Sequence, residues 1–87
     1  MDDAAIQKAL AVKARYEARL MQMANVVGVG VGLRERGGQL TDEIVLVINV
    51  TRKLPRRQLA PQDLIPAEIE GVPVDVRETG QIRALGR

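Results

Sequence analysis

The stretch "NVVGVGVGLRERGGQLTDEIVLVINV", residues 25–50, carries the strongest signals for the fold of this chain. Its first part alternates valine or leucine with glycine, so that Gly28, Gly30 and Gly32 share one face of an extended segment. Its last part is apolar at every position from 44 to 48, which is typical of a central strand covered on both faces. The stretch therefore predicts a sheet whose second strand is better covered than its neighbours.

The same stretch predicts a β-hairpin. We expect its strands at residues 26–34 and 43–51, with a long polar loop around Gly37 and Gly38 between them. Glycines at alternate positions remove every Cβ atom from one face of the first strand, and another element can then approach its backbone closely. The residues leave open whether that element is the protein's own helix, with Tyr16 on it, or a surface of another chain.

Nucleotide binding by the glycine-rich segment is disfavoured. A dinucleotide fingerprint needs a third glycine in the pattern G-x-G-x-x-G and a helix that begins inside it, whereas the residues after Gly32 are strand-like and charged. The chain also contains no Gly-Lys-Thr or Gly-Lys-Ser of a P-loop. We therefore expect no cofactor.

An amphipathic helix is predicted before the hairpin, at residues 2–24. This segment contains no Gly or Pro, and its aspartates can cap the first turn. Lys13 and Glu17 are four residues apart and are expected to form an ion pair. The apolar stripe at helical spacing consists of Ala5, Ala9, Val12, Tyr16, Leu20 and Met23.

A proline-punctuated segment, residues 51–71, follows the hairpin, with helical turns expected near 56–59 and 61–64. Residues 72–77 then alternate valine with other residues, which predicts a strand with one apolar face. Because Pro73 lacks a backbone N–H, we expect this strand at an edge of the sheet.

These elements predict one small α+β domain over residues 1–87, a long N-terminal helix packed on a small, mainly antiparallel sheet of about three strands. The helix is expected at 1–24, the sheet and its proline-rich loop at 25–80, and a tail at 81–87.

Composition limits the chemistry of the chain. It contains no His, Cys or Ser, so neither a thiolate metal site nor a Ser/His or Cys/His nucleophile can be built, and we expect no enzyme activity and no metal. The net charge of +2 disfavours nucleic-acid binding by bulk electrostatics. No apolar run approaches the roughly 20 residues of a membrane span. The start Met-Asp-Asp is not typical of a signal peptide, so a cytoplasmic location is expected.

The motif "RKLPRR" places four cations within six residues, Arg52, Lys53, Arg56 and Arg57. No aromatic residue accompanies it for base stacking. The favoured interpretation is a solvated loop with local ion pairs to the acids that follow, and the next is contact with an acidic protein surface. The acidic residues around 42–43, 68–70 and 75–78 match no calcium-binding loop and are expected to be solvated.

Several short motifs, contained in three stretches, occur here in an order typical of one family. The stretches "NVVGVGVGLRERGGQLTDEIVLVINVTRKLP", "LIPAEIEGVPVDVRETG" and "IRALG" resemble the N-terminal module that precedes the catalytic domain in bacterial trypsin-like serine peptidases, a family related to the narrow-leaf type of plants. The resemblance covers about residues 20–86. It implies an accessory module, because the catalytic His, Asp and Ser of that family belong to the following domain and match no position here.

The expected function is a non-catalytic module for protein–protein interaction or self-assembly, whose partner is a second copy or another protein, including a peptidase domain. Two alternatives stay open. One is a prodomain-like inhibitor or folding aid of a separate peptidase, in which Arg83 or Arg87 of the tail would enter a specificity pocket. The other is a small structural subunit of a particle or filament. The candidate interaction residues are Gly28, Gly30, Gly32, Arg52, Lys53, Arg56, Arg57 and Arg83.

Overall fold

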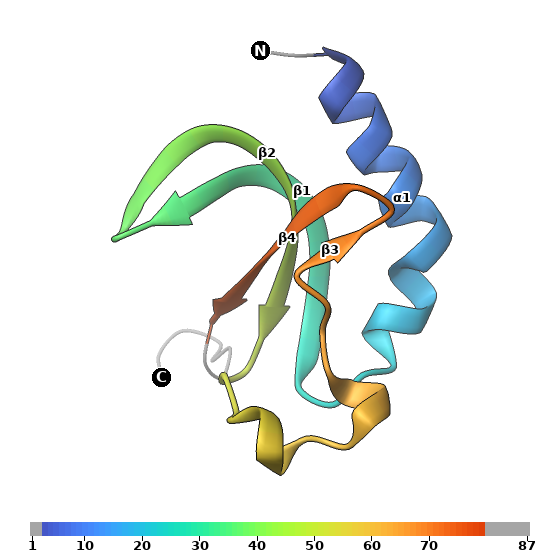
Figure 1. The fold of residues 1–87 in the computed structure, drawn as a ribbon, viewed down its shortest axis with the longest axis vertical. Helices are drawn as coiled ribbons and strands as arrows, with labels where there is room; N and C mark the ends of the chain where they lie inside the picture. The colour runs from blue at the N-terminus through green and yellow to red at the C-terminus, as the bar shows by residue number, and fades with distance from the viewer. Residues whose placement is uncertain (1–2, 80–87) are drawn as a thin grey trace, which may run out of the picture.

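The computed structural model describes residues 3–79, which form one helix packed on a four-stranded sheet (Figure 1). The strand order is β1-β2-β4-β3. The elements are α1 Asp3–Met21, β1 Val26–Arg36, β2 Gln39–Val50, β3 Glu68–Ile69 and β4 Val72–Glu78. The predicted α+β class is confirmed, with one more strand than expected. The tail predicted at 81–87 lies outside the described residues.

Helix α1 buries the stripe that the sequence predicts. Ala9, Val12 and Leu20 are fully covered, and Tyr16 and Met23 pack against the same core. The expected ion pair beside this stripe also forms, with 2.9 Å between Lys13 Nζ and Glu17 Oε1. The helix is therefore held by its amphipathic face.

The helix ends three residues earlier than predicted. Gln22 and Met23 donate their N–H groups to carbonyls three residues back, and Asn25 then takes a left-handed backbone with φ of 71°. Asn tolerates this conformation because its short polar side chain bonds locally. The Asn25 side chain accepts a hydrogen bond of 2.9 Å from the Thr51 hydroxyl. This turn directs the chain into β1.

The long hairpin loop predicted between β1 and β2 is wrong. The strands continue to a two-residue turn at Gly37 and Gly38, whose φ values are 58° and 82°. Two positive φ angles suit the right-handed twist of a tight hairpin, so the polar residues on either side pair instead of looping. The register shifts between Leu33 and Glu35, and a bulge of this kind bends a strand. Figure 1 shows the outer half of the hairpin curving away from α1.

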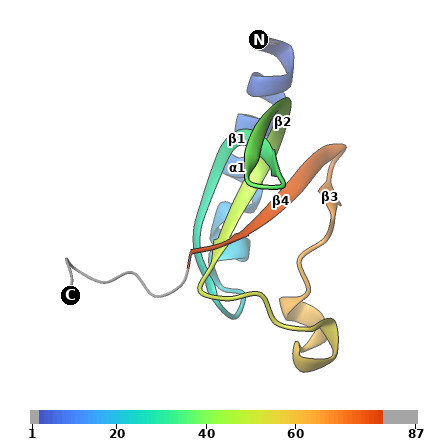
Figure 2. The same ribbon diagram turned by 90° about the vertical axis from the view of Figure 1, so that its left-hand side faces the viewer.

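Strand β2 is the central strand, as predicted, with Val45, Leu46, Val47 and Ile48 all buried. It pairs antiparallel with β1 and parallel with β4. The sheet is therefore mixed, because the segment after β2 crosses back before β4 begins. This crossover contains two single-turn 3-10 helices, η1 Arg56–Gln58 and η2 Pro61–Asp63, where helical turns were expected. The two turns lie at one end of the sheet, opposite to the first turns of α1 (Figure 2).

The main core lies between α1 and one face of the sheet. Its strand residues alternate along β2 and β4, as expected for one face of each strand. The buried members are Ala9, Val12, Leu20, Val26, Leu46, Ile48, Val50, Ile69, Val72 and Val74. The face of β4 that carries Val72, Val74 and Val76 is the apolar face predicted from the sequence.

Candidate functional site

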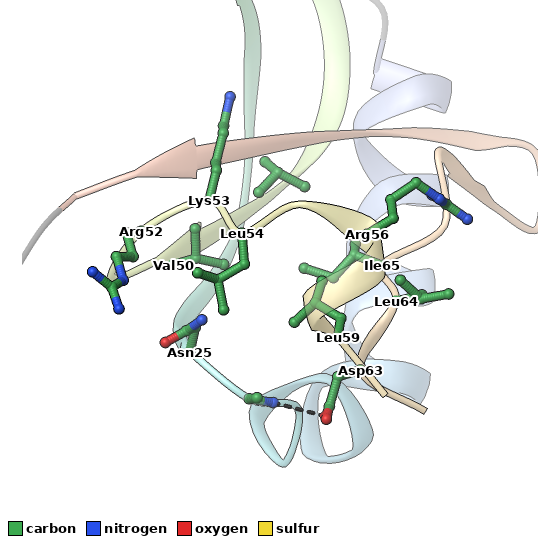
Figure 3. A pocket seen from close by; sticks show the side chains of 12 residues that line it. Asn25, Val50, Arg52, Lys53, Leu54, Arg56, Leu59, Asp63, Leu64 and Ile65 are labelled. Atoms are coloured by element: carbon green, nitrogen blue, oxygen red, sulfur yellow. Dashed lines mark hydrogen bonds between the residues drawn. The ribbon is translucent and has the colours of Figure 1, made fainter. Parts of the chain in front are cut away.

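The crossover between β2 and β4 encloses a pocket of about 190 Å³ at the end of the sheet (Figure 3). The residues that line it are Ala24, Asn25, Val50, Arg52, Lys53, Leu54, Arg56, Leu59, Asp63, Leu64, Ile65 and Val76. They come from the turn after α1, from β2, from β4 and from the crossover. The pocket therefore exists only in the folded chain.

The inner surface of the pocket is aliphatic. In Figure 3, Val50 and Leu54 lie on one side of it, and Leu59 and Ile65 lie on the other. The leucines and isoleucine of the crossover are only half-buried, whereas Val50 belongs to the core. Prolines prevent the crossover from forming a longer helix, so these side chains remain around an unfilled space. Such a surface can accept one further apolar side chain.

Three of the four cations in "RKLPRR" surround this pocket. Arg52, Lys53 and Arg56 line it and are exposed, whereas Arg57 is exposed but does not contribute to the lining. Arg52 and Arg56 lie at opposite ends of the pocket in Figure 3. The site thus combines an aliphatic interior with a cationic rim.

The local ion pairs expected for these cations do not form within residues 3–79. Asp63 accepts a hydrogen bond of 2.9 Å from the Ala24 N–H instead, and Glu70 pairs with Arg15. The acids that follow the motif are near it in sequence, but the crossover turns them toward the helix. This leaves the rim available to carboxylates from elsewhere.

Two hydrogen bonds attach the walls of the pocket to the rest of the fold. The bond from Ala24 to Asp63 ties η2 to the end of α1. The Lys53 N–H donates to Glu78 Oε2 at 3.1 Å, which ties the start of the crossover to the end of β4. The walls of the pocket are therefore attached to the helix on one side and to the sheet on the other.

The glycine face lies on the side of the sheet opposite to α1. Gly30 pairs with Val47, whereas the adjacent Val29 pairs with Ile48, and both Val29 and Ile48 belong to the core beneath the helix. Successive residues of a strand point to opposite faces, so the glycines point away from α1. The interpretation in which the protein's own helix fills the glycine face is therefore wrong. Gly28 and Gly32 pair with Asn49 and Val45 in the same way.

The centre of the glycine face is open. A Cβ atom at Gly30 would meet no atom within 4 Å, and one at Gly32 would come to 3.3 Å from Val47 Cγ2. The glycines do not line the pocket at the crossover. The candidate residues from the sequence therefore form two separate surfaces, and Arg83 lies outside the described residues.

A polar contact braces the sheet on the glycine side. The Arg77 guanidinium in β4 binds Asp75 at 3.1 Å and also donates to the Leu33 carbonyl, so it crosses β2 to reach β1. Asp75 in turn accepts the Glu35 N–H at 2.9 Å. Burial raises the pKa of Asp75, but the Glu35 N–H and the Arg77 guanidinium outweigh burial and leave the pKa below its ordinary value. These contacts connect β4 to β1 at the position where the hairpin bends.

A second polar cluster joins α1 to the turn between β3 and β4. Glu70 and Gly71 form that turn with φ values of 50° and 83°. The Glu70 carboxylate binds the Arg15 guanidinium and accepts a hydrogen bond of 2.7 Å from the Tyr16 hydroxyl. The hydrogen bonds from Arg15 and Tyr16 lower the pKa of Glu70, and the same carboxylate raises the pKa of Tyr16. This cluster was not predicted from the sequence, because Tyr16 and Glu70 are 54 residues apart in the chain.

Four of the acidic residues expected to be solvated are partners in such contacts, namely Glu43, Glu70, Asp75 and Glu78. Glu43, for example, pairs with Arg34 at 2.6 Å. Within residues 3–79, no three acidic side chains gather where they could hold a metal ion. No helix in the same range is long and apolar enough to cross a membrane.

The pocket lining was also not predicted from the sequence. No motif in residues 51–71 indicates that the aliphatic residues of the crossover surround a cavity. The signal in the sequence is the recurrence of aliphatic residues between and after the cations, at positions 54, 59, 64 and 65.

These observations define, within residues 3–79, a small α+β domain with one α-helix, a bent mixed sheet and a cation-rimmed aliphatic pocket. The chain belongs to the NARROW LEAF 1 N-terminal domain family, whose model matches residues 4–79. Comparison with curated proteins finds no match.

The family match corrects the resemblance inferred from short motifs. The assignment to the N-terminal module of bacterial trypsin-like peptidases is wrong, because the matching model is that of the NARROW LEAF 1 N-terminal domain. The match also includes nearly all of α1, which the motif resemblance left out. Short glycine- and valine-rich motifs follow from the geometry of a bent hairpin, so they do not separate one family from another.

Proposed function

We propose that this domain is a non-catalytic protein-interaction module that binds an acidic, apolar segment of a partner protein in the crossover pocket. The observation that carries the proposal is the aliphatic interior beside three cations that have no ion-pair partner within residues 3–79. The absence of His, Cys and Ser supports the non-catalytic part of the proposal. A cytoplasmic location is also part of this proposal.

The size of the pocket favours a side chain over a small molecule. Its volume of about 190 Å³ is smaller than the about 300–1,000 Å³ of most small-molecule sites. One aliphatic side chain of a partner would be desolvated inside it, and carboxylates on either side would meet the rim. The cations are exposed, so they add association rate and selectivity more than affinity.

The test starts from a displayed library of random peptides selected against the full chain. Peptides that bind are expected to carry an aliphatic residue flanked by Asp or Glu, and their affinity should fall as salt increases. Arg56→Glu should weaken binding by about tenfold or more, since a rim cation becomes a like charge. Arg57→Glu is the matched control, because Arg57 is the next residue in η1 but does not line the pocket.

A library that yields no binder would contradict the proposal. The proposal would also fail if every binder were affected equally by Arg56→Glu and Arg57→Glu, since binding would then depend on total charge alone.

Self-association through the glycine face is a second candidate, supported by the open space above Gly30. Another backbone can approach a strand closely where side chains are missing. The absolute mass in solution by light scattering tests it. An oligomer that becomes a monomer in Gly30→Val, with the fold unchanged, would support it, and a monomeric wild type would exclude it.

A further inference from the structure

The outer edge of β4 is only partly covered. Strand β3 pairs with Val72 and Pro73 alone, and the Val74 N–H donates to the Ala67 carbonyl at 2.9 Å just beyond that pair. The backbone groups of Val74 therefore point outward, away from β2. Within residues 3–79, no strand continues this pairing beside the rest of β4.

The unpaired groups on this edge can be assigned from the alternation of the strand. The Thr79 N–H donates to the Val50 carbonyl of β2 at 2.8 Å, so the groups of Thr79 point inward. Successive residues direct their N–H and C=O groups to opposite edges. The N–H and C=O groups of Val76 and Glu78 consequently point outward, on the uncovered part of the edge.

This edge adjoins the pocket. Val76 contributes its backbone to the edge and its side chain to the pocket lining. Side chains of paired residues on adjacent strands lie on the same face of a sheet. A strand added beside Val76 would therefore place every second side chain on the pocket side of the sheet.

We propose that an extended segment of a partner protein pairs with β4 at Val76 and Glu78 and inserts one aliphatic side chain into the pocket, with carboxylates against Arg52, Lys53 and Arg56. The occupant is a separate acidic protein segment, because the rim cations have no carboxylate partner within residues 3–79. This inference rests on the proposed function of the pocket and specifies how the segment is held. Main-chain pairing supplies affinity in such complexes, and the pocket supplies selectivity.

The first experiment measures amide hydrogen exchange of the full chain with and without the peptides selected from the displayed library. The Val76 and Glu78 amides are expected to become protected when a peptide binds. The Val74 and Thr79 amides are internal controls, since both already donate hydrogen bonds in the free chain.

The second experiment compares Glu78→Pro with Glu78→Ala. Both variants lose the carboxylate that accepts a hydrogen bond from the Lys53 N–H. Only proline also removes the backbone N–H of residue 78, so that the exposed edge of β4 loses one hydrogen-bond donor. Glu78→Pro is expected to bind the peptides about tenfold more weakly than Glu78→Ala. Circular dichroism establishes that both are folded, and the exchange experiment decides the question if the proline variant is not.

The outcomes separate the two proposals. Peptides that depend on Arg56, leave both amides unprotected and bind the two Glu78 variants equally would overturn strand pairing and leave the pocket function intact. A library without binders would overturn both. Protection of Val76 and Glu78 together with the loss in Glu78→Pro would support strand pairing.

Discussion

The Tyr16 hydroxyl of α1 donates a hydrogen bond of 2.7 Å to the Glu70 carboxylate in the turn between β3 and β4. Glu70 takes a left-handed backbone with φ of 50°, an uncommon conformation for a residue with a side chain. Arg15 binds the same carboxylate, so two adjacent helix residues hold the turn. This turn determines where β4 begins, and β4 contributes Val76 to the lining of the pocket.

The first prediction concerns the titration of Glu70. Arg15→Gln and Tyr16→Phe should each raise the pKa of Glu70, and Arg15→Gln should raise it more, because the Arg15 hydrogen bond is the larger cause of the lowered value. Side-chain NMR titration of Glu70 measures both. Equal pKa values in the wild type and in both variants would show that the cluster does not form in solution.

The lowered pKa also sets the sign of a pH dependence. Because the folded-state pKa of Glu70 lies below that of the unfolded chain, its stabilising effect is complete above the ordinary glutamate value of about 4.3. It is lost as pH falls through the folded-state pKa. Urea unfolding of the wild type and of Glu70→Gln should therefore differ at pH 7 and converge in acid.

The second prediction concerns the hairpin turn. Gly37→Val should lower the free energy of unfolding by about 1–2 kcal/mol, because its φ of 58° is left-handed and a β-branched side chain clashes there. Gly37→Asn should cost only a few tenths of a kcal/mol, since Asn is common at this position of a two-residue turn. Urea denaturation compares them, and equal losses would contradict the tight turn.

The third prediction concerns the glycine face. Gly30→Ala should raise the free energy of unfolding by about 0.5–1 kcal/mol, because alanine costs less conformational entropy in a strand and finds open space there. Gly32→Ala should gain less, since its Cβ comes to 3.3 Å from Val47 Cγ2 and that side chain must move. Thermal unfolding at one protein concentration measures the order of the two. A loss of stability in Gly30→Ala would show that the face is occupied.

The fourth prediction concerns the wall of the pocket. Asp63→Ala should lower the free energy of unfolding by about 1 kcal/mol, because the Ala24 N–H loses its acceptor. Asp63→Asn retains an acceptor oxygen and should cost less. Amide exchange at Ala24 is the direct measurement, and it should accelerate in Asp63→Ala. Unchanged exchange would mean that η2 is not attached to the helix through this bond.

The pattern of the sequence was sufficient for most elements of the fold, but it missed β3, so the edge position expected for the strand at Val72 is wrong: β4 lies between β2 and β3, and Pro73 pairs with Glu68. Helix α1, the hairpin and the strand at Val72 follow from local periodicity, because an amphipathic stripe or an apolar run is a property of neighbouring residues. The end of α1 and the length of the hairpin were wrong, because both depend on left-handed residues, at Asn25 and at Gly37. The sequence permits these backbone conformations, but the contacts around Asn25 and Gly37 determine that they form.

The candidate site was predictable only in its charges. The motif at positions 52–57 was visible as a group of cations, but the ion pairs expected for it were wrong, because Asp63 accepts the Ala24 N–H after the end of α1 and Glu70 binds Arg15 of α1. The aliphatic residues of the lining could be recognised in the sequence, but the cavity that they surround could not. A cavity depends on what a crossover encloses, and short motifs do not contain that information.

The sequence by itself determined the class of the domain, and it contains no His, Cys or Ser. Only the tertiary structure decided that the glycines face away from α1, since a strand presents two faces and the pairing of Val29 with Ile48 selects which one meets the helix. The parallel pairing of β2 with β4 was likewise decided by the fold, and it brings Val50 and Val76 to the same pocket. Periodicity is local, whereas register and crossover are set by contacts between residues far apart in the chain.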